Sequence, residues 1–81
     1  MKDIAIYGAG GFGKEVACLI KRINEKEPTW NLIGFFDDDE FIWNKPVSHF
    51  GICLGGITAL NNFEKELSIV MAMGKSTTVK Y

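Results

Sequence analysis

The chain of 81 residues has little of what metal, membrane or nucleic-acid proteins need. It holds two cysteines and one histidine, with no C-x-x-C spacing and no pair of histidines, so a zinc site is not expected. No apolar run approaches the roughly 18 residues that cross a bilayer, and no basic and apolar leader opens the chain. Nine basic and ten acidic side chains leave a net charge of -1, which gives no general attraction for nucleic acid or anionic lipid. We therefore expect a cytoplasmic protein without a membrane or nucleic-acid partner, whose two thiols are reduced and buried or half-buried.

The most informative segment is the glycine-rich stretch at residues 7–14, which reads YGAGGFGK. It follows a short apolar run at residues 4–6 and precedes a helical pattern at residues 11–25. A strand, a glycine turn and a helix start in this order place the free N–H groups of the first helical turn, and the positive end of the helix dipole, over the loop. Such a turn favours an anion, and a diphosphate suits it well.

Within that stretch, Gly8, Gly10 and Gly13 match the spacing G-x-G-x-x-G. Gly8 is predicted to allow the tight turn, Gly10 to let the backbone approach a phosphate, and Gly13 to let the helix pack close on the strand. Gly11 adds a fourth position without a Cβ atom. The spacing alone is a weak signal because glycine clusters also form ordinary turns.

A second apolar run, at residues 32–36, ends in a cluster of acidic residues about twenty residues after the loop. Because open parallel sheets bind ligands at the carboxyl ends of their strands, Asp37 and Asp38 are candidates to accept hydrogen bonds from ribose hydroxyls or a base N–H. Asp39 and Glu40 lie further from the strand end and are expected to be solvated. A solvated acidic turn remains the alternative interpretation of the whole cluster.

The apolar pattern predicts an α/β fold, namely a small Rossmann-like three-layer domain over residues 1–81 with a short, mostly parallel sheet of about four strands. The strands are expected near residues 3–7, 31–36, 51–54 and 68–73, and the first and last of them are expected to be buried on both faces. The helices are expected at residues 11–25 and 58–63, with a last one that begins at residue 76 and is cut off. The core stripe of the first helix is predicted to be Phe12, Val16, Leu19, Ile20 and Ile23.

Four further residues are candidates of lower weight. Gly74 would let the backbone approach the ligand after the last strand, and Lys75 could offset part of a diphosphate's charge. Trp43 could stack on a base, although packing beneath its own loop is the better interpretation. His49 has no partner at catalytic spacing and is expected to be a surface loop residue.

One βαβ half of a nucleotide fold has room for a nucleoside diphosphate or its sugar conjugate, whereas a dinucleotide site needs two halves. No Walker lysine is present, so hydrolysis of ATP or GTP is not indicated. No side chain is an obvious nucleophile or tuned base. An NAD(P)-binding module of an oxidoreductase or redox-sensing regulator stays open as an alternative, and so does a ligand-sensing or assembly domain without chemistry.

Four segments, residues 6–13, 34–39, 54–57 and 72–75, together resemble the N-terminal domain of the sugar O-acyltransferases of the sialic acid O-acetyltransferase (NeuD) and bacillosamine N-acetyltransferase (PglD) type. The resemblance covers nearly the whole chain. It implies a domain that binds the nucleotide part of a UDP- or CMP-linked amino sugar, with contacts from Gly10, Gly11, Phe12, Asp37, Asp38 and Gly74. In that family a left-handed β-helix follows, which forms a homotrimer, binds acetyl-CoA and supplies a catalytic histidine.

The sequence departs from the family pattern at two points. Many members have a histidine at the position of Phe12, so a hydrogen bond from that imidazole is absent, and the resemblance does not carry the family's preference for sugar or base over to this chain. The 81 residues also do not include the β-helical region. The resemblance therefore implies a chain that binds a nucleotide-linked amino sugar without catalysing acyl transfer, and that holds no cofactor of its own.

Overall fold

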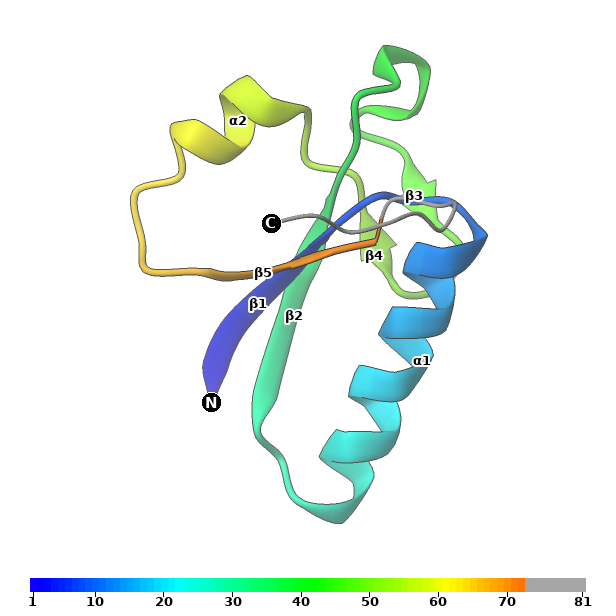
Figure 1. Cartoon of the computed structure of the whole chain (residues 1–81), viewed down its shortest axis with the longest axis vertical. Coiled ribbons are helices and arrows are strands. Elements are labelled where there is room, and N and C mark those ends of the chain that lie inside the picture. Colours follow the sequence, from blue (N-terminus) through cyan, green and yellow to red (C-terminus); the bar gives the residue numbers. More distant parts are fainter. Residues whose placement is uncertain (73–81) are drawn as a thin grey trace.

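A computed structural model describes residues 1–72 of the chain (Figure 1). The expected last helix, Gly74 and Lys75 lie outside the described residues. The elements in chain order are β1 (Lys2–Tyr7), α1 (Gly11–Lys26), β2 (Trp30–Phe36), a 3-10 turn η1 (Glu40–Ile42), β3 (Pro46–Val47), β4 (Gly51–Ile52), α2 (Ile57–Asn61) and β5 (Ser68–Met71). The first two strands and the first helix begin and end within one residue of the bounds expected from the sequence.

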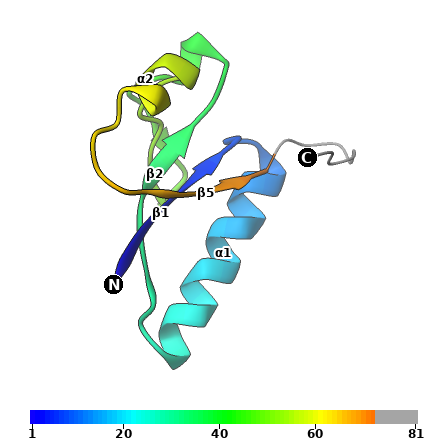
Figure 2. The same cartoon turned by 60° about the vertical axis from the view of Figure 1, so that its left-hand side comes forward.

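The main sheet has the strand order β2-β1-β5, and both neighbours of β1 run parallel to it. Helix α1 lies on one face of this sheet and α2 on the other, which gives the three layers that the sequence predicts (Figure 2). Strand β1 is buried on both faces because its side chains alternate between the two cores. The predicted α/β, Rossmann-like class is therefore confirmed.

The parallel sheet of the described residues has three strands, whereas about four were expected. The predicted third strand, at residues 51–54, contributes β4, which pairs antiparallel with β3 in a separate hairpin. Only an isolated bridge between Cys53 and Phe35 joins this segment to the main sheet. The turn at residues 48–50 brings β3 and β4 together locally, and closing so short a loop costs less entropy than a long-range pairing with β2.

Two hydrophobic clusters cover the faces of the sheet. On the α1 side, Ile4, Ile6 and Phe35 pack with Ala17 and Ile20 of the helix. On the other side, the buried residues are Ala5, Tyr7 and Phe36, and the residues packed against them include Ala59 and Leu60 of α2 and Phe63 just after it. Because β1 supplies residues to both clusters, its carboxyl end is held firmly where the glycine loop begins.

The prediction for the core face of α1 was wrong for three of its five residues. Phe12, Leu19 and Ile23 are 49%, 54% and 40% exposed. Of the predicted stripe, Ile20 is buried and Val16 packs against the core, and the other buried residues of the helix are Gly13 and Ala17. Small residues at these last two positions let the start of the helix approach β1 closely, and no element of residues 1–72 covers the neighbouring stripe.

Two other burial expectations also fail. Strand β5 is half-buried or exposed along its length, because only β1 pairs with it in the described part of the chain. Cys18 is exposed on α1, whereas Cys53 is buried, and both are free thiols.

In residues 1–72 no helix combines the length and the apolar character that crossing a lipid bilayer requires.

Side-chain hydrogen bonds fix the end of α1 against the start of β2. The side chain of Asn24 accepts hydrogen bonds from the N–H groups of Thr29 and Trp30 at 3.0 Å, and its amide donates to the carbonyl of Trp30 at 2.8 Å. Trp30 packs against the core cluster on the α1 side. These hydrogen bonds fix the start of β2 and thereby the direction of the strand, whose other end carries the acidic cluster.

Candidate functional site

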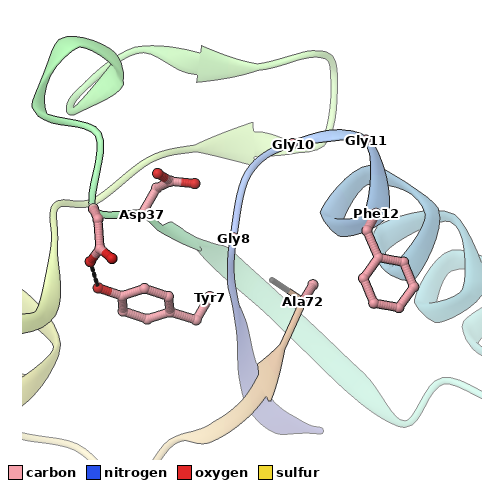
Figure 3. Close-up of a pocket in the computed structure, with 8 residues that line it drawn as sticks. Tyr7, Gly8, Gly10, Gly11, Phe12, Asp37 and Ala72 are labelled. Carbon is pink, nitrogen blue, oxygen red and sulfur yellow. Dashed lines mark hydrogen bonds between the residues drawn. The ribbon is translucent and has the colours of Figure 1, made fainter. Parts of the chain in front are cut away.

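A cleft of about 230 Å³ lies where the carboxyl ends of β1, β2 and β5 meet the start of α1 (Figure 3). This is the edge at which open parallel sheets bind ligands. Its lining residues are Tyr7, Gly8, Gly10, Gly11, Phe12, Asp37, Asp38 and Ala72. Six of the nine residues proposed from the sequence thus line one cleft, Gly13 lies directly beneath it in α1, and Gly74 and Lys75 lie outside the described residues.

A second cleft, of about 360 Å³, is larger but lies at the opposite edge of the sheet. Its lining comes from the chain start and the segment that leads into β5, namely Met1, Lys2, Asp3, Glu66, Leu67 and Ser68. Neither α1 nor α2 contributes a residue to this lining. We therefore place the candidate site in the smaller cleft, where the helix start and the acidic cluster converge.

Gly8 and Gly13 perform the tasks predicted for them. Gly8 has a φ of 117°, a conformation that glycine adopts without strain and other residues rarely adopt. A Cβ atom placed on Gly13 would lie 1.9 Å from the carbonyl oxygen of Gly8, so only glycine lets the first turn of α1 approach the strand end this closely. The N–H of Gly8 donates to the carbonyl of Phe36 at 2.7 Å, which continues the pairing of β1 and β2 into the loop.

Gly10 and Gly11 are different, because nothing in the described protein requires them to be glycine. A Cβ atom on either residue would meet no atom within 4 Å, and neither residue has a positive φ. Within residues 1–72, no acceptor bonds to the N–H groups of Gly11, Phe12 or Gly13. Three unpaired amides and two residues without side chains are what an anion needs in order to approach the start of a helix.

Asp37 ties the acidic cluster to the glycine loop. Its Oδ2 accepts a hydrogen bond from the N–H of Ala9 at 2.7 Å, and its Oδ1 accepts one from the N–H of Asp39 at 2.9 Å. Its own N–H donates to the carbonyl of Gly55 at 2.9 Å. The side chain is half-buried and faces the cleft. Asp37 therefore fixes the position of the loop relative to the end of β2.

A hydrogen bond from the loop after β2 holds the backbone of Asp37 in place. The indole N–H of Trp43 donates to the carbonyl of Asp37 at 2.7 Å. Gly56 leaves room for the indole ring, because a Cβ atom there would lie 2.7 Å from it. Trp43 thus packs beneath its own loop, as expected, and does not line the cleft.

Asp38 pairs with a residue that the sequence interpretation missed. The hydroxyl of Tyr7 donates to Oδ1 of Asp38 at 2.5 Å (Figure 3). Burial, the hydrogen bond to Asp38 and the nearby carboxylates raise the pKa of Tyr7 to about 12, so the hydroxyl keeps its proton at neutral pH. The tyrosine directly precedes Gly8 at a strand end, which is the signal that could have placed it in the site.

The cleft presents two opposite chemical characters. The amides of α1 offer only donors, whereas Asp37, Asp38 and the oxygen of Tyr7 offer acceptors. Among residues 1–72 no basic side chain is part of the lining, and the groups in that range that can attract an anion are the backbone amides and the helix dipole. Phe12 lies across the cleft from Tyr7, half exposed and beside the loop (Figure 3).

His49, the remaining candidate, lies away from the cleft. His49 is exposed, stacks near Phe50 with ring centroids 4.2 Å apart, and does not line the cleft. In the described part of the chain, no three His, Cys, Asp or Glu side chains gather in a way that could hold a metal ion.

Comparison with known families identifies the family of the chain. A family model described as the PglD N-terminal domain matches residues 3–80. No curated protein and no solved structure matches the chain significantly. The family match spans nearly the whole chain and includes the glycine loop, Asp37 and Asp38. The chain therefore belongs to the PglD N-terminal domain family and is a domain related to sugar acetyltransferases.

Proposed function

We propose that this domain binds the nucleotide part of a UDP- or CMP-linked amino sugar for an acetyl-CoA-dependent sugar acetyltransferase. The observation that carries the proposal is the pairing of three unbonded amides at the start of α1 with two carboxylates across the same cleft. The amides suit the diphosphate or phosphate of a nucleotide. The carboxylates suit the ribose hydroxyls or a base N–H.

The open space at Gly10 and Gly11 supports the proposal independently. Neither packing nor backbone conformation explains why these residues lack side chains. Close approach of a phosphate to the backbone does explain it, because a Cβ atom would occupy part of the volume that the ligand needs. The cleft of about 230 Å³ lies below the roughly 300–1,000 Å³ typical of ligand pockets, so a nucleotide bound there would be only partly enclosed.

In this proposal the domain holds the substrate and the chemistry lies elsewhere. An acceptor amine or hydroxyl of the sugar attacks the thioester of acetyl-CoA with the help of a general base, which a further domain would supply. A homotrimer formed through that further domain, and a place in the cytoplasm, remain proposals of the same kind. The residues of the cleft contribute by fixing the nucleotide end of the substrate.

Isothermal titration calorimetry with UDP, UDP-N-acetylglucosamine, CMP and NADH tests the proposal. We expect binding of UDP or CMP and of the matching nucleotide sugar, with NADH much weaker. Micromolar binding of NADH without a response to UDP or CMP would contradict the proposal and favour the NAD(P)-binding alternative. Binding of none of the four would favour a domain without a nucleotide ligand.

The variant Asp37→Ala links the titration to the site. Loss of its carboxylate releases the N–H of Ala9 and removes an acceptor from the cleft. We expect the nucleotide affinity to fall by roughly 1 to 3 kcal/mol. The matched control is Glu40→Gln, which removes one nearby negative charge outside the cleft lining. An affinity that Asp37→Ala leaves unchanged would remove this residue from the site.

A further inference from the structure

The two carboxylates of the cleft differ in how much of their hydrogen-bonding capacity the protein already uses. Both oxygens of Asp37 accept backbone N–H groups, from Ala9 and from Asp39. Asp38 accepts only the hydroxyl of Tyr7, on Oδ1, and its Oδ2 has no hydrogen-bond partner among residues 1–72. Asp37 is also half-buried, whereas Asp38 is exposed at the cleft.

Tyr7 restricts the direction of the Asp38 carboxylate. Its ring is 4% exposed and lies stacked beside Phe36, with ring centroids 6.4 Å apart, so the hydroxyl has a fixed position. Its proton points to Oδ1, because that oxygen is the hydroxyl's acceptor. A carboxylate held through one oxygen presents the other in a defined orientation, which lowers the entropy lost when a ligand binds.

Because the hydroxyl of Tyr7 donates to Asp38, only its lone pairs remain for a ligand. Among residues 1–72, the side chains at this end of the cleft therefore accept hydrogen bonds and donate none to a ligand. A ligand that satisfies the site must carry an anion at the helix start and a hydroxyl or N–H donor beside Asp38. Inorganic phosphate or diphosphate alone meets only the first requirement.

We infer that Asp38, oriented by Tyr7, accepts a hydrogen bond from a hydroxyl or N–H group of the ligand. Asp37, in contrast, is a positioning residue that holds the glycine loop. The inference rests on the proposed function and assigns different roles to two neighbouring acids. The donor belongs to the ribose hydroxyls or to the base. Both sources share the same chemistry, and two ligand analogues separate them.

The experiment is a calorimetric titration with UDP, or with CMP where CMP is the nucleotide that binds in the titration above. The first analogue is the 2′,3′-dideoxyribose form, which lacks the ribose donors. The second is methylated on the base nitrogen that carries the donor. The proteins are the unchanged chain, Asp38→Ala, Tyr7→Phe and Asp37→Asn, with Glu40→Gln as the charge control.

In the unchanged protein, we expect the analogue that lacks the relevant donor to bind about tenfold to a hundredfold more weakly than the parent nucleotide. This penalty should disappear in Asp38→Ala, because the acceptor is gone. It should shrink in Tyr7→Phe, which keeps the ring and therefore the packing. In Asp37→Asn all three ligands should lose affinity by a similar factor, so the penalty persists. Glu40→Gln should alter neither the penalty nor the order of affinities.

Three results would contradict the inference, and they are distinguishable. If the weaker binding of the analogue persists in Asp38→Ala and vanishes in Asp37→Asn, Asp37 is the residue that accepts the ligand's hydrogen bond and Asp38 is not. If the parent nucleotide binds and neither analogue binds more weakly, Asp38 does not accept a hydrogen bond from the ligand, and the proposed function stays intact. Binding of neither UDP nor CMP to the unchanged protein would overturn the proposed function and this inference with it.

Discussion

Replacement of Gly13 by alanine should destabilise the fold. The added Cβ atom would lie 1.9 Å from the carbonyl oxygen of Gly8 and 2.9 Å from its carbonyl carbon, and both are backbone atoms that cannot rotate away. Restoring a contact of 3.0 Å requires the strand end and the helix start to separate by about 1.1 Å. Overpacking of this kind costs roughly 1–3 kcal/mol, and the better helix propensity of alanine returns at most about 1 kcal/mol.

We expect a net loss of about 1–2 kcal/mol for Gly13→Ala, which lowers the melting temperature of a domain this small by roughly 4–16 °C. Gly11→Ala is the matched control, because its Cβ atom meets nothing within 4 Å and its φ is not positive. It should retain the stability of the unchanged protein or gain slightly, while its nucleotide affinity falls. Thermal and urea unfolding followed by circular dichroism measures both variants. Equal stability of Gly13→Ala and the unchanged protein would refute the close approach of α1 to β1.

Three further predictions concern the surroundings of the site. Trp43→Phe should lower the free energy of unfolding by about 1 kcal/mol in urea denaturation, because the indole bond to the Asp37 carbonyl is lost; unchanged stability would show that this bond contributes nothing. A thiol reagent should modify Cys18 rapidly and Cys53 only after unfolding, because Cys53 is fully buried and burial raises its pKa; fast reaction of both thiols would contradict the packing of Cys53. The pKa of Tyr7 is raised to about 12 in the folded state, so its contribution to the free energy of unfolding should be fully present and independent of pH below about pH 10, and should be lost as the pH rises from about 10 to about 12; in Tyr7→Phe that part of the decrease should be absent from alkaline unfolding curves.

Local features were predictable from the sequence, because adjacent residues determine them. The glycine spacing fixed the tasks of Gly8 and Gly13, and the end of the apolar run placed Asp37 at the cleft. Pairings between distant residues were harder. Tyr7 and Asp38 are 31 residues apart, and their contact depends on the register that sets Tyr7 opposite Phe36. Asp38 lies two residues beyond the end of β2, where the period of a strand no longer determines which way a side chain points.

The buried face of α1 shows a second limit of sequence interpretation. The helix carries two neighbouring stripes that are both apolar enough to form a core, about 100° apart. The larger side chains of the first stripe suggested that it faces the sheet. Close approach at Gly13 selected the stripe with the smaller residues instead. The β3–β4 hairpin reflects the same limit, because a short apolar run does not reveal which strand it pairs with.

The most direct test of the central claim is a nuclear magnetic resonance titration of the ¹⁵N-labelled chain with UDP and with CMP. If the start of α1 holds the phosphate of a nucleotide, the amide resonances of Gly11, Phe12 and Gly13 should show the largest shifts, followed by those of Asp37 and Asp38. Saturable shifts confined to other parts of the chain, with these three amides unmoved, would contradict the account.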